Sequence, residues 1–595
     1  MDQKNYSILL AFLLFSKTTL SFFCSQSIFV PRPQGTNAAR RLAVADHQLP
    51  VDNICYAFWA IPEFTRSYRC KEIAKALFGC NQLVFSGSRV ENRGKRDILA
   101  DYFGLPSDFK STVCFNPTIT NFLFDVGFTF NLDWVRKGTR LQFYAPFVHT
   151  RWNLCLCEKI QQKGENFSPA GYLVGGNQRI DRSRLASDVK TAFRGCTTFG
   201  DMQDPLRYGK ICGTQTKTEI AQACTRLFLE LTSKEKYYCD ASLMISAPTG
   251  TRVTAEYLFD PIVGANHHWQ LGFGLHGLWQ MWSDDYEDEQ QKDWAGKSKL
   301  KPEKKEPVIN RSCAFILDLN FSTLLPTQQR RSFDFKKAGR GSRYMLLSSM
   351  EQPRDDILQV PAGSSPEQQY IGHLFPAINK TTLCCDVYIP FQADLLFAFS
   401  YKRNSWTFYI GYNFWGRTQE KLRNRQRFES NKFALKGDAQ LYGYFNPLVN
   451  NLDVAVPLNG TQSNATIYAG QADASGNYNT DFLNLNIDNP VNAREANTPG
   501  GLNQLTVDDA ADLGIVQGNV QGSNPAVLLT DCDIDTCSAL SPKASSSKLF
   551  FNSSWKLKRQ ENWEPFIGFG AEVEFGHSCQ ALSQFGAWLT FGALY

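Results

Sequence analysis

The sequence predicts an all-β protein, an antiparallel β-barrel of about 12 to 14 strands with long loops. Three observations support this prediction. Apolar and polar residues alternate with a period of two in many stretches, as they do along β-strands. These stretches run for about 9 to 13 residues, longer than the roughly 5 to 6 residues of an average soluble strand. They are spread over a chain of 595 residues that is 43% hydrophobic and 13% aromatic.

The stretch 122–134 shows the alternation most clearly. One face carries Phe122, Phe124, Val126, Phe128, Phe130, Leu132 and Trp134, and the other carries Leu123, Asp125, Gly127, Thr129, Asn131 and Asp133. A helix would scatter the apolar set around its axis, so only a strand places it on one face. The other predicted strands are 54–67, 82–90, 138–152, 241–250, 269–281, 312–324, 391–402, 406–414, 547–558, 567–575 and 585–595, with weaker candidates at 343–350 and 434–445.

The predicted strands have the length and composition of strands that cross a membrane. A tilted transmembrane strand needs about 9 to 11 residues. Trp134, Trp269 and Trp406 stand near strand ends, where aromatic girdles occur in membrane barrels. The mean hydropathy of −0.31 is too low for a bundle of membrane helices. A soluble sandwich, with its aromatic face hidden against a second sheet, is the alternative.

Residues 1–27 are predicted to be a signal peptide for export. Lys4 precedes a short apolar run, Ile8 to Phe15, and serines follow at positions 21, 25 and 27. The apolar run is too short to span a bilayer. Export makes disulfides possible, and we predict loop disulfides within a cysteine-containing loop region, 153–240.

The C-terminus carries a second indication of a membrane barrel. Leu589, Phe591 and Tyr595 share one face of the last predicted strand. This pattern resembles the terminal assembly signal of bacterial outer-membrane β-barrels, the porin-like superfamily. The resemblance implies a Gram-negative outer membrane, short periplasmic turns, long outer loops and recognition by barrel-assembly machinery.

The resemblance also divides the chain: residues 28–595 are the barrel, and 418–546 is a long insertion. The acidic stretch 451–545 holds two basic and eleven acidic residues, a net charge of −9 within a chain of +5. We expect 418–546 to form an outer loop or to fold into the barrel as a plug. The tight connections 402–405 and 559–562 belong on the inner side, but the turn near 135–138 falls on the outer side with this strand list.

The polar face of the predicted strands gives the candidate pore lining. Charged and amide side chains on this face would set ion preference across a channel. The lumen-facing candidates are Asp125, Asn131, Asp133, Gln270, His276, Gln280, Lys556, Glu572 and Glu574.

Other constellations give little support for catalysis or metal binding. The spacing of Asp531, Asp533 and Asp535 is that of the first ligands of a calcium-binding loop. The glycine and the closing glutamate of an EF-hand do not follow them in the sequence. The carboxylates of Glu572 and Glu574 are spaced closely enough to serve as the catalytic pair of a glycosidase. A role in lining the barrel lumen is favoured over catalysis. No Ser-His-Asp arrangement is identifiable in the sequence, and we predict no cofactor and no enzymatic activity.

The sequence therefore predicts an outer-membrane barrel that acts as a passive channel or as a structural envelope protein. The expected partners are outer-membrane lipid and lipopolysaccharide, and the oligomeric state stays open. The mild net charge of +5 argues against nucleic acid. The alternatives are an adhesin that uses 418–546 as its contact surface and, with less support, an outer-membrane enzyme.

Overall fold

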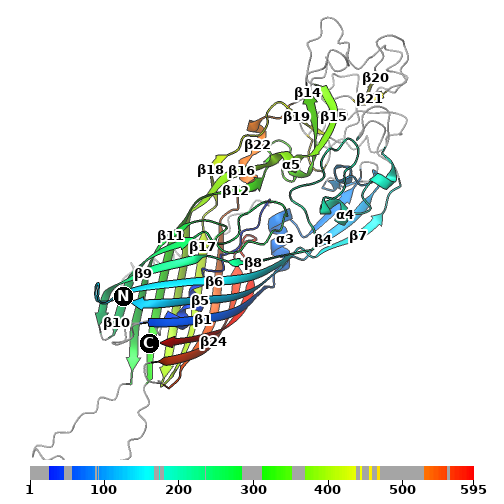
Figure 1. Ribbon diagram of the computed structural model, residues 1–595. Coiled ribbons are helices and arrows are strands. Elements are labelled where there is room, and N and C mark those ends of the chain that lie inside the picture. Colours follow the sequence, from blue (N-terminus) through cyan, green and yellow to red (C-terminus); the bar gives the residue numbers. More distant parts are fainter. Residues whose placement is uncertain are drawn as a thin grey trace, which may run out of the picture.

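Figure 1 shows the fold of the chain in a computed structural model. It describes residues 26–45, 56–87, 90, 93–94, 96–165, 173, 180–234, 236–284, 311–351, 369–436, 442–444, 455–457, 465–468, 528–558 and 563–595. The predicted signal peptide lies outside the described residues, except for Gln26 and Ser27. No described helix is both long and apolar enough to cross a membrane.

Twelve antiparallel strands form a closed barrel, so the predicted fold class is confirmed. Each barrel strand pairs with the next one along the chain, and the pairing of the first strand with the last closes the sheet. The barrel strands are β1 (Tyr56–Ser67), β5 (Thr118–Asn131), β6 (Thr139–Asn153), β9 (Ala223–Lys234), β10 (Tyr237–Ala247), β11 (Gln270–Ser283), β12 (Arg311–Ser332), β16 (Thr382–Arg403), β17 (Trp406–Arg417), β23 (Ala544–Lys556), β24 (Glu564–Gly576) and β25 (Gln584–Leu594).

The two faces of the barrel differ as the alternation predicts. In β5, Phe122, Phe124 and Phe128 are exposed on the outer face, while Leu123 and Asp125 are buried on the inner face. The same alternation of exposed apolar and buried polar positions runs through β24. Because successive side chains of a strand point to opposite faces, the outward face of the barrel is apolar and the lumen is polar.

Large aromatic side chains lie around the barrel near the end at which β1 begins and β25 ends. Trp406 of β17 stacks on Trp555 of β23 with ring centroids 5.2 Å apart, and Tyr237 stacks on Trp279 at 6.4 Å. Tyr595 packs against Trp563 at 5.4 Å and exchanges two backbone hydrogen bonds with Tyr56. The C-terminal strand is therefore fixed in the closed sheet.

Most connections at one end of the barrel are short, and most at the opposite end are long (Figure 1). Tight connections at one end include 132–138, 235–236 and 404–405. The turn near 135–138 thus lies at the same end as 404–405, which corrects the sequence-based placement. The predicted turn 559–562 lies outside the described residues. The opposite end carries the connections 68–117, 154–222, 248–269, 333–381 and 418–543, and their described residues are called the cap here.

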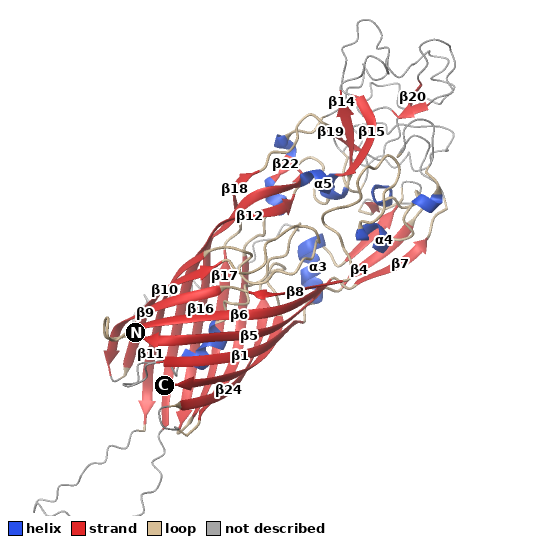
Figure 2. Cartoon of the chain, in the orientation of Figure 1, coloured by secondary structure: helices blue, strands red, loops and turns tan. Residues whose placement is uncertain are grey.

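The cap is built from small sheets and short helices (Figure 2). Its sheets contain β2 (Gln82–Ser86), β3 (Ile98–Leu99), β4 (Lys110–Phe115) and β7 (Leu156–Gln162); β14 (Leu346–Glu351), β15 (Gln369–Pro376) and β19 (Phe433–Lys436); β13 (Asp334–Phe335) with β22 (Ile534–Asp535); and β20 (Tyr442–Tyr444) with β21 (Ala455–Pro457). Its helices are α3 (Cys70–Phe78), α4 (Val189–Arg194) and α5 (Ala377–Thr381), and β8 (Thr214–Ile220) and β18 (Lys421–Arg425) extend the barrel sheet beside β6 and β16.

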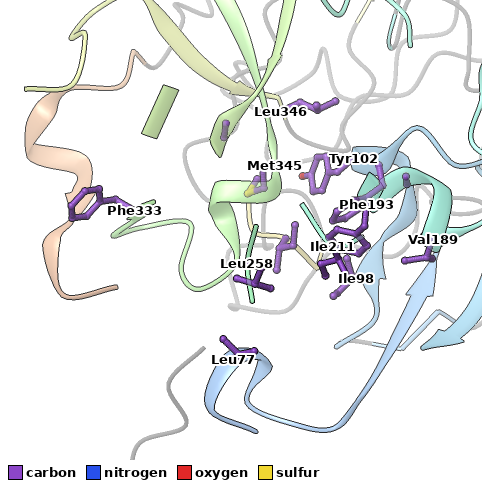
Figure 3. Close-up of a cluster of buried hydrophobic side chains, with 14 of the residues drawn as sticks. Leu77, Ile98, Tyr102, Val189, Phe193, Ile211, Leu258, Phe333, Met345 and Leu346 are labelled. Atoms are coloured by element: carbon purple, nitrogen blue, oxygen red, sulfur yellow. The ribbon is translucent and has the colours of Figure 1, made fainter. Parts of the chain in front are cut away.

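A hydrophobic core of its own holds the cap together. Leu77, Phe193, Phe333, Met345 and Leu346 come from three of the long connections and are all buried in one cluster (Figure 3). Burial of this size is the main stabilising term of an ordinary globular domain. The long connections therefore fold as a unit on the end of the barrel.

The observed strands differ from the predicted ones in three places. Residues 82–90 contain β2, which belongs to the cap, and so do β14 and β19 near the weaker candidates 343–350 and 434–445. The missing barrel strand is β9, which was assigned to the loop region 153–240. Adding β9 moves the 135–138 turn to the correct end.

The predicted loop disulfides are absent from the described residues, where every cysteine is a free thiol. Part of the reason is positional: Cys224 lies on β9 and Cys239 on β10, in the barrel wall. The two residues are therefore held by strand pairing rather than placed in flexible loops.

Candidate functional site: the barrel lumen

The N-terminal segment, residues 26–45, runs inside the barrel. Its first residues pack against the cap core: Phe29 is buried against the rings of Trp152 of β6 and Phe259 of the cap at 6.2 and 6.3 Å. Its last residues form helix α2 (Ala38–Ala45), which contacts β16, β17, β23, β24 and β25 within the barrel. The segment therefore passes from the cap into the lumen.

Local chemistry explains why a helix begins at residue 38. The Asn37 side chain accepts a hydrogen bond from the backbone N–H of Arg40 at 3.3 Å, which is the bond of an N-cap residue. Ala38 and Ala39 follow and are completely buried. Their small side chains allow the helix to pack closely against the lumen wall.

Arg32 binds the wall through three strands at once. Its guanidinium donates to Asp394 Oδ1 of β16 at 3.0 Å, to Asn413 Oδ1 of β17 at 2.9 Å and to Glu574 Oε1 of β24 at 3.3 Å. The Trp415 ring lies 5.9 Å from the guanidinium carbon. Planar guanidinium groups suit such multiple contacts with carboxylates better than an ammonium group does.

Arg40 makes the second set of ion pairs, with the adjacent strands β1 and β5. It is completely buried, and its guanidinium donates to Glu63 Oε2 of β1 and to Asp125 Oδ2 of β5, the latter at 2.9 Å. Glu63 and Asp125 are themselves buried. Because an unpaired buried charge is costly, each carboxylate depends on Arg40 for its counter-ion.

Arg41 contacts a third part of the wall. Its guanidinium donates to the hydroxyl of Tyr144 on β6 at 3.2 Å and lies 5.5 Å from the centre of that ring. Together, the three arginines bind six of the twelve barrel strands: β16, β17, β24, β1, β5 and β6. The N-terminal segment is thus fastened to the wall by charge as well as by packing.

The lumen wall that faces the segment is acidic. Five carboxylates contact the segment or its immediate partners, while Lys548 of β23 is the wall cation that joins them, 2.7 Å from Glu572 Oε1 and 3.9 Å from Glu574 Oε2. The carboxylates are Glu63, Asp125, Asp394, Glu572 and Glu574. Without the segment, these carboxylates would face the lumen with a net negative charge.

Aromatic rings inside the barrel fill the space beside α2. Four of them lie across glycines of the neighbouring strand, so that a Cβ on the glycine would meet the ring within 2.6 Å. The directly paired residues are Trp59 with Gly127, Phe550 with Gly411, Trp588 with Gly570 and Phe566 with Gly592. Glycine on the lumen face therefore provides the room for these rings, a role also known from the design of curved sheets.

A small cavity lies beside the segment. It is next to Arg32 and Asn37, is lined also by Glu63, Lys548 and Glu572, and has a volume of about 30 Å³. That volume holds about one or two water molecules. The described residues therefore leave room for little more than water at this point between the segment and the wall.

The structure places most of the predicted lining residues on the inner face. Asp125, Glu572 and Glu574 are buried around the N-terminal segment, and Gln270 is buried and donates to Ser322 Oγ at 2.8 Å. His276 and Gln280 lie on inward positions of β11, and Lys556 pairs with Glu564 at 3.6 Å.

Asp133 is the exception. It is exposed in the turn after β5, accepts from the Asn131 side-chain amide at 2.7 Å and accepts from the Gly138 N–H. Asn131 is the last residue of β5, lies half-buried on the inward parity and is paired in register with Arg140. The prediction that Asp133 lines the lumen is therefore wrong, because the strand ends at Asn131.

Other predicted residues have structural partners. Asp531 accepts from the Phe428 N–H and pairs with Arg425, Asp533 accepts from Thr530, and Asp535 accepts from the Cys537 N–H. The described residues contain no group of three side chains suited to a metal ion.

Leu589 and Phe591 are exposed on the outer face of β25. The described residues of 418–543 lie in the cap, and the lumen is filled by the N-terminal segment.

No family model and no curated protein matches the chain. Among solved structures, the chain is similar to an outer-membrane channel from Pseudomonas putida F1, with 8% identity, 92% of this chain and 99% of that chain covered, and a TM-score of 0.28. It is also similar to the transport unit of the autotransporter AIDA-I from Escherichia coli, with 6% identity, 95% of this chain and 99% of that chain covered, and a TM-score of 0.26. A third similar structure is that of a Pseudomonas aeruginosa FadL homologue, with 6% identity, 96% of each chain covered, and a TM-score of 0.23.

These similarities concern architecture alone. The resemblance to outer-membrane β-barrels that the sequence predicts is confirmed at this level by the closed barrel of the chain itself. The contents of the lumen must be interpreted from the chain's own residues.

Proposed function

We propose that the protein is an outer-membrane channel that its own N-terminal segment holds closed, and that it passes small cations when the segment leaves the lumen. The observation that carries this proposal is the set of buried ion pairs between Arg32 and Arg40 of the segment and the acidic wall.

The outer surface supports a membrane location. Along β11 the exposed residues Trp269 and Trp279 stand ten positions apart, with Leu271, Phe273 and Leu275 exposed between them. Ten residues of strand span roughly 34 Å, or about 24 Å in height at a tilt of 45°. This height matches the apolar band of about 25 Å that outer-membrane barrels present to lipid.

A polar row follows the apolar band on the cap side. Arg66, Thr120 and Arg151 are paired in register across β1, β5 and β6, one outward position beyond Phe64 and Phe122. Both arginines are exposed, where lipid phosphates would lie. We propose outer-leaflet lipid, lipopolysaccharide included, as the partner of this row, with the cap outside the cell.

Ion selectivity follows from the acidic wall. When the segment leaves, Glu63, Asp125, Asp394, Glu572 and Glu574 lose the cations of the segment, while Lys548 stays paired with Glu572 and Glu574. Carboxylates around a narrow pore favour cations. The open lumen is therefore expected to exclude anions.

The test is deletion of residues 28–45, followed by conductance measurements in planar bilayers. The full chain is expected to give no steady conductance, whereas the deletion variant gives open steps whose reversal potential in a KCl gradient shows preference for K⁺. A full chain that conducts as well as the deletion variant would contradict the proposal, and so would anion preference after deletion. Heat-modifiable gel migration shows whether the variant is still a folded barrel.

A further inference from the structure

Three residues on adjacent barrel strands form a hydrogen-bonded series on the lumen face. Ser242 Oγ of β10 lies 3.0 Å from His276 Nε2 of β11, and His276 Nδ1 lies 2.8 Å from Asp318 Oδ1 of β12. Each ring nitrogen of the histidine has a different partner, a hydroxyl on one side and a carboxylate on the other. This is the order of contacts in nucleophile–base–acid triads, which recur on unrelated folds.

Strand register brings the three side chains together. His276 is paired directly with Asp318 on one side and with Asp240 on the other, while Ser242 is paired with Gly274. Gly274 keeps the space between them free, because a Cβ there would lie 2.7 Å from Ser242 Oγ and 3.0 Å from His276 Nε2. Asp240 is engaged by Arg140 at 2.6 Å and by the Tyr238 hydroxyl, which leaves Asp318 to orient the histidine.

Arg226 of β9 is the cation on the neighbouring inward position of this wall. It is paired in register with Met244, the next inward residue after Ser242 on β10. Its guanidinium donates to Asn320 Oδ1 at 2.7 Å, and its buried Nε has no hydrogen-bond partner among the described residues. Because preorganised positive groups stabilise developing negative charge, Arg226 is the group to which the oxyanion is assigned below.

The N-terminal segment reaches the neighbourhood of this part of the wall. Arg41 of α2 donates to the Tyr144 hydroxyl, which lies 4.0 Å from the sulfur of Met244, the next inward residue after Ser242 on β10. Ser242 is buried, whereas the side chains of His276 and Asp318 are 18% and 16% exposed. The burial of Ser242 is the reason to expect that it becomes reactive only when the segment leaves.

We propose that Ser242, His276 and Asp318 form a latent serine-hydrolase site that acts on small carboxylic esters entering the opened lumen. Ser242 Oγ attacks the acyl carbon while His276 Nε2 takes its proton, and Arg226 stabilises the resulting oxyanion. The ester C–O bond then breaks, and His276 returns the proton to the departing alcohol. Water attacks the acyl-enzyme in the same way, releasing the carboxylic acid and restoring Ser242. Asp318 is the positioning residue for the histidine.

This proposal rests on the proposed function for access, so the test separates the two. The 28–45 deletion variant is treated with a fluorophosphonate probe, which bonds covalently to activated serines, and its conductance is measured on the same preparation. Labelling is expected in the deletion variant, strongly reduced in the full chain, and lost with Ser242→Ala. Ser246→Ala is the matched control, since Ser246 lies on the same face of β10, is buried, and has no hydrogen-bond partner for its hydroxyl within the described part of the chain.

The outcomes are distinct. A deletion variant that conducts but is not labelled overturns the hydrolase site and leaves the channel standing, as does labelling that persists in Ser242→Ala. Labelling at Ser242 without conductance supports the site and contradicts the channel. If the deletion variant does not fold, the full-length double variant Arg32→Ala, Arg40→Ala replaces it in both measurements. His276→Gln is expected to abolish labelling while heat-modifiable migration is retained.

Discussion

Arg40→Ala is expected to release the N-terminal segment and to open the lumen. Arg40 is the only residue of the segment that contacts Glu63 and Asp125 together, and all three side chains are buried. Removing one partner of a buried ion pair leaves uncompensated charge and costs about 3 to 5 kcal/mol. The variant should show frequent open steps in planar bilayers, where the full chain with Arg40 stays closed.

Neutralising the wall provides the matched control. In Arg40→Ala combined with Glu63→Gln and Asp125→Asn, no buried carboxylate is left without a partner. This triple variant is expected to close more often than Arg40→Ala alone, since the cost lies in the unpaired charges rather than in the missing arginine. Equal conductance of the two variants would show that the ion pairs do not hold the segment.

Phe569→Arg is expected to prevent stable insertion of the barrel. Phe569 is exposed on the outer face of β24, six positions from Trp563 in the aromatic girdle, and packs against Phe551 at 5.9 Å. This places it near the middle of the apolar band. An arginine on the lipid face costs about 2 to 4 kcal/mol at the bilayer midplane. Folding into lipid vesicles, followed by heat-modifiable migration, measures the loss.

Phe569→Leu is the control for this prediction, because it keeps an apolar side chain toward lipid. Its folded fraction should match that of the unchanged protein. A folded fraction for Phe569→Arg equal to that of Phe569→Leu would mean that the outer face of β24 does not contact lipid.

The barrel could be predicted because alternation is a local property. Phe122, Phe124 and Phe128 face outward whether or not their partner strands are known. Strand β9 was missed although Leu227, Leu229 and Leu231 alternate there, because the inward Phe228 weakens the contrast and the nearby cysteines suggested a loop. Asp133 was misplaced because alternation does not mark where a strand ends.

The contents of the lumen could not be predicted in the same way. Arg32, Arg40 and Arg41 follow a signal-like stretch, and a chain with three arginines in ten residues usually lies in water. One indication was present: Asp125, Glu572 and Glu574 were predicted on the inner face, which requires a basic partner. The Ser242–His276–Asp318 series was missed because it depends on the register of three strands, and register cannot be read from one sequence.

The most direct test of the account is to ask what occupies the lumen. Arg41 is replaced by the photo-crosslinker p-benzoylphenylalanine in the full chain, and the irradiated, folded barrel is digested and analysed by mass spectrometry. Because Arg41 lies against Tyr144, the account predicts crosslinks within the same chain to the β6 peptide that contains Tyr144. Crosslinks to lipid or to other chains, with none to the barrel wall, would contradict it.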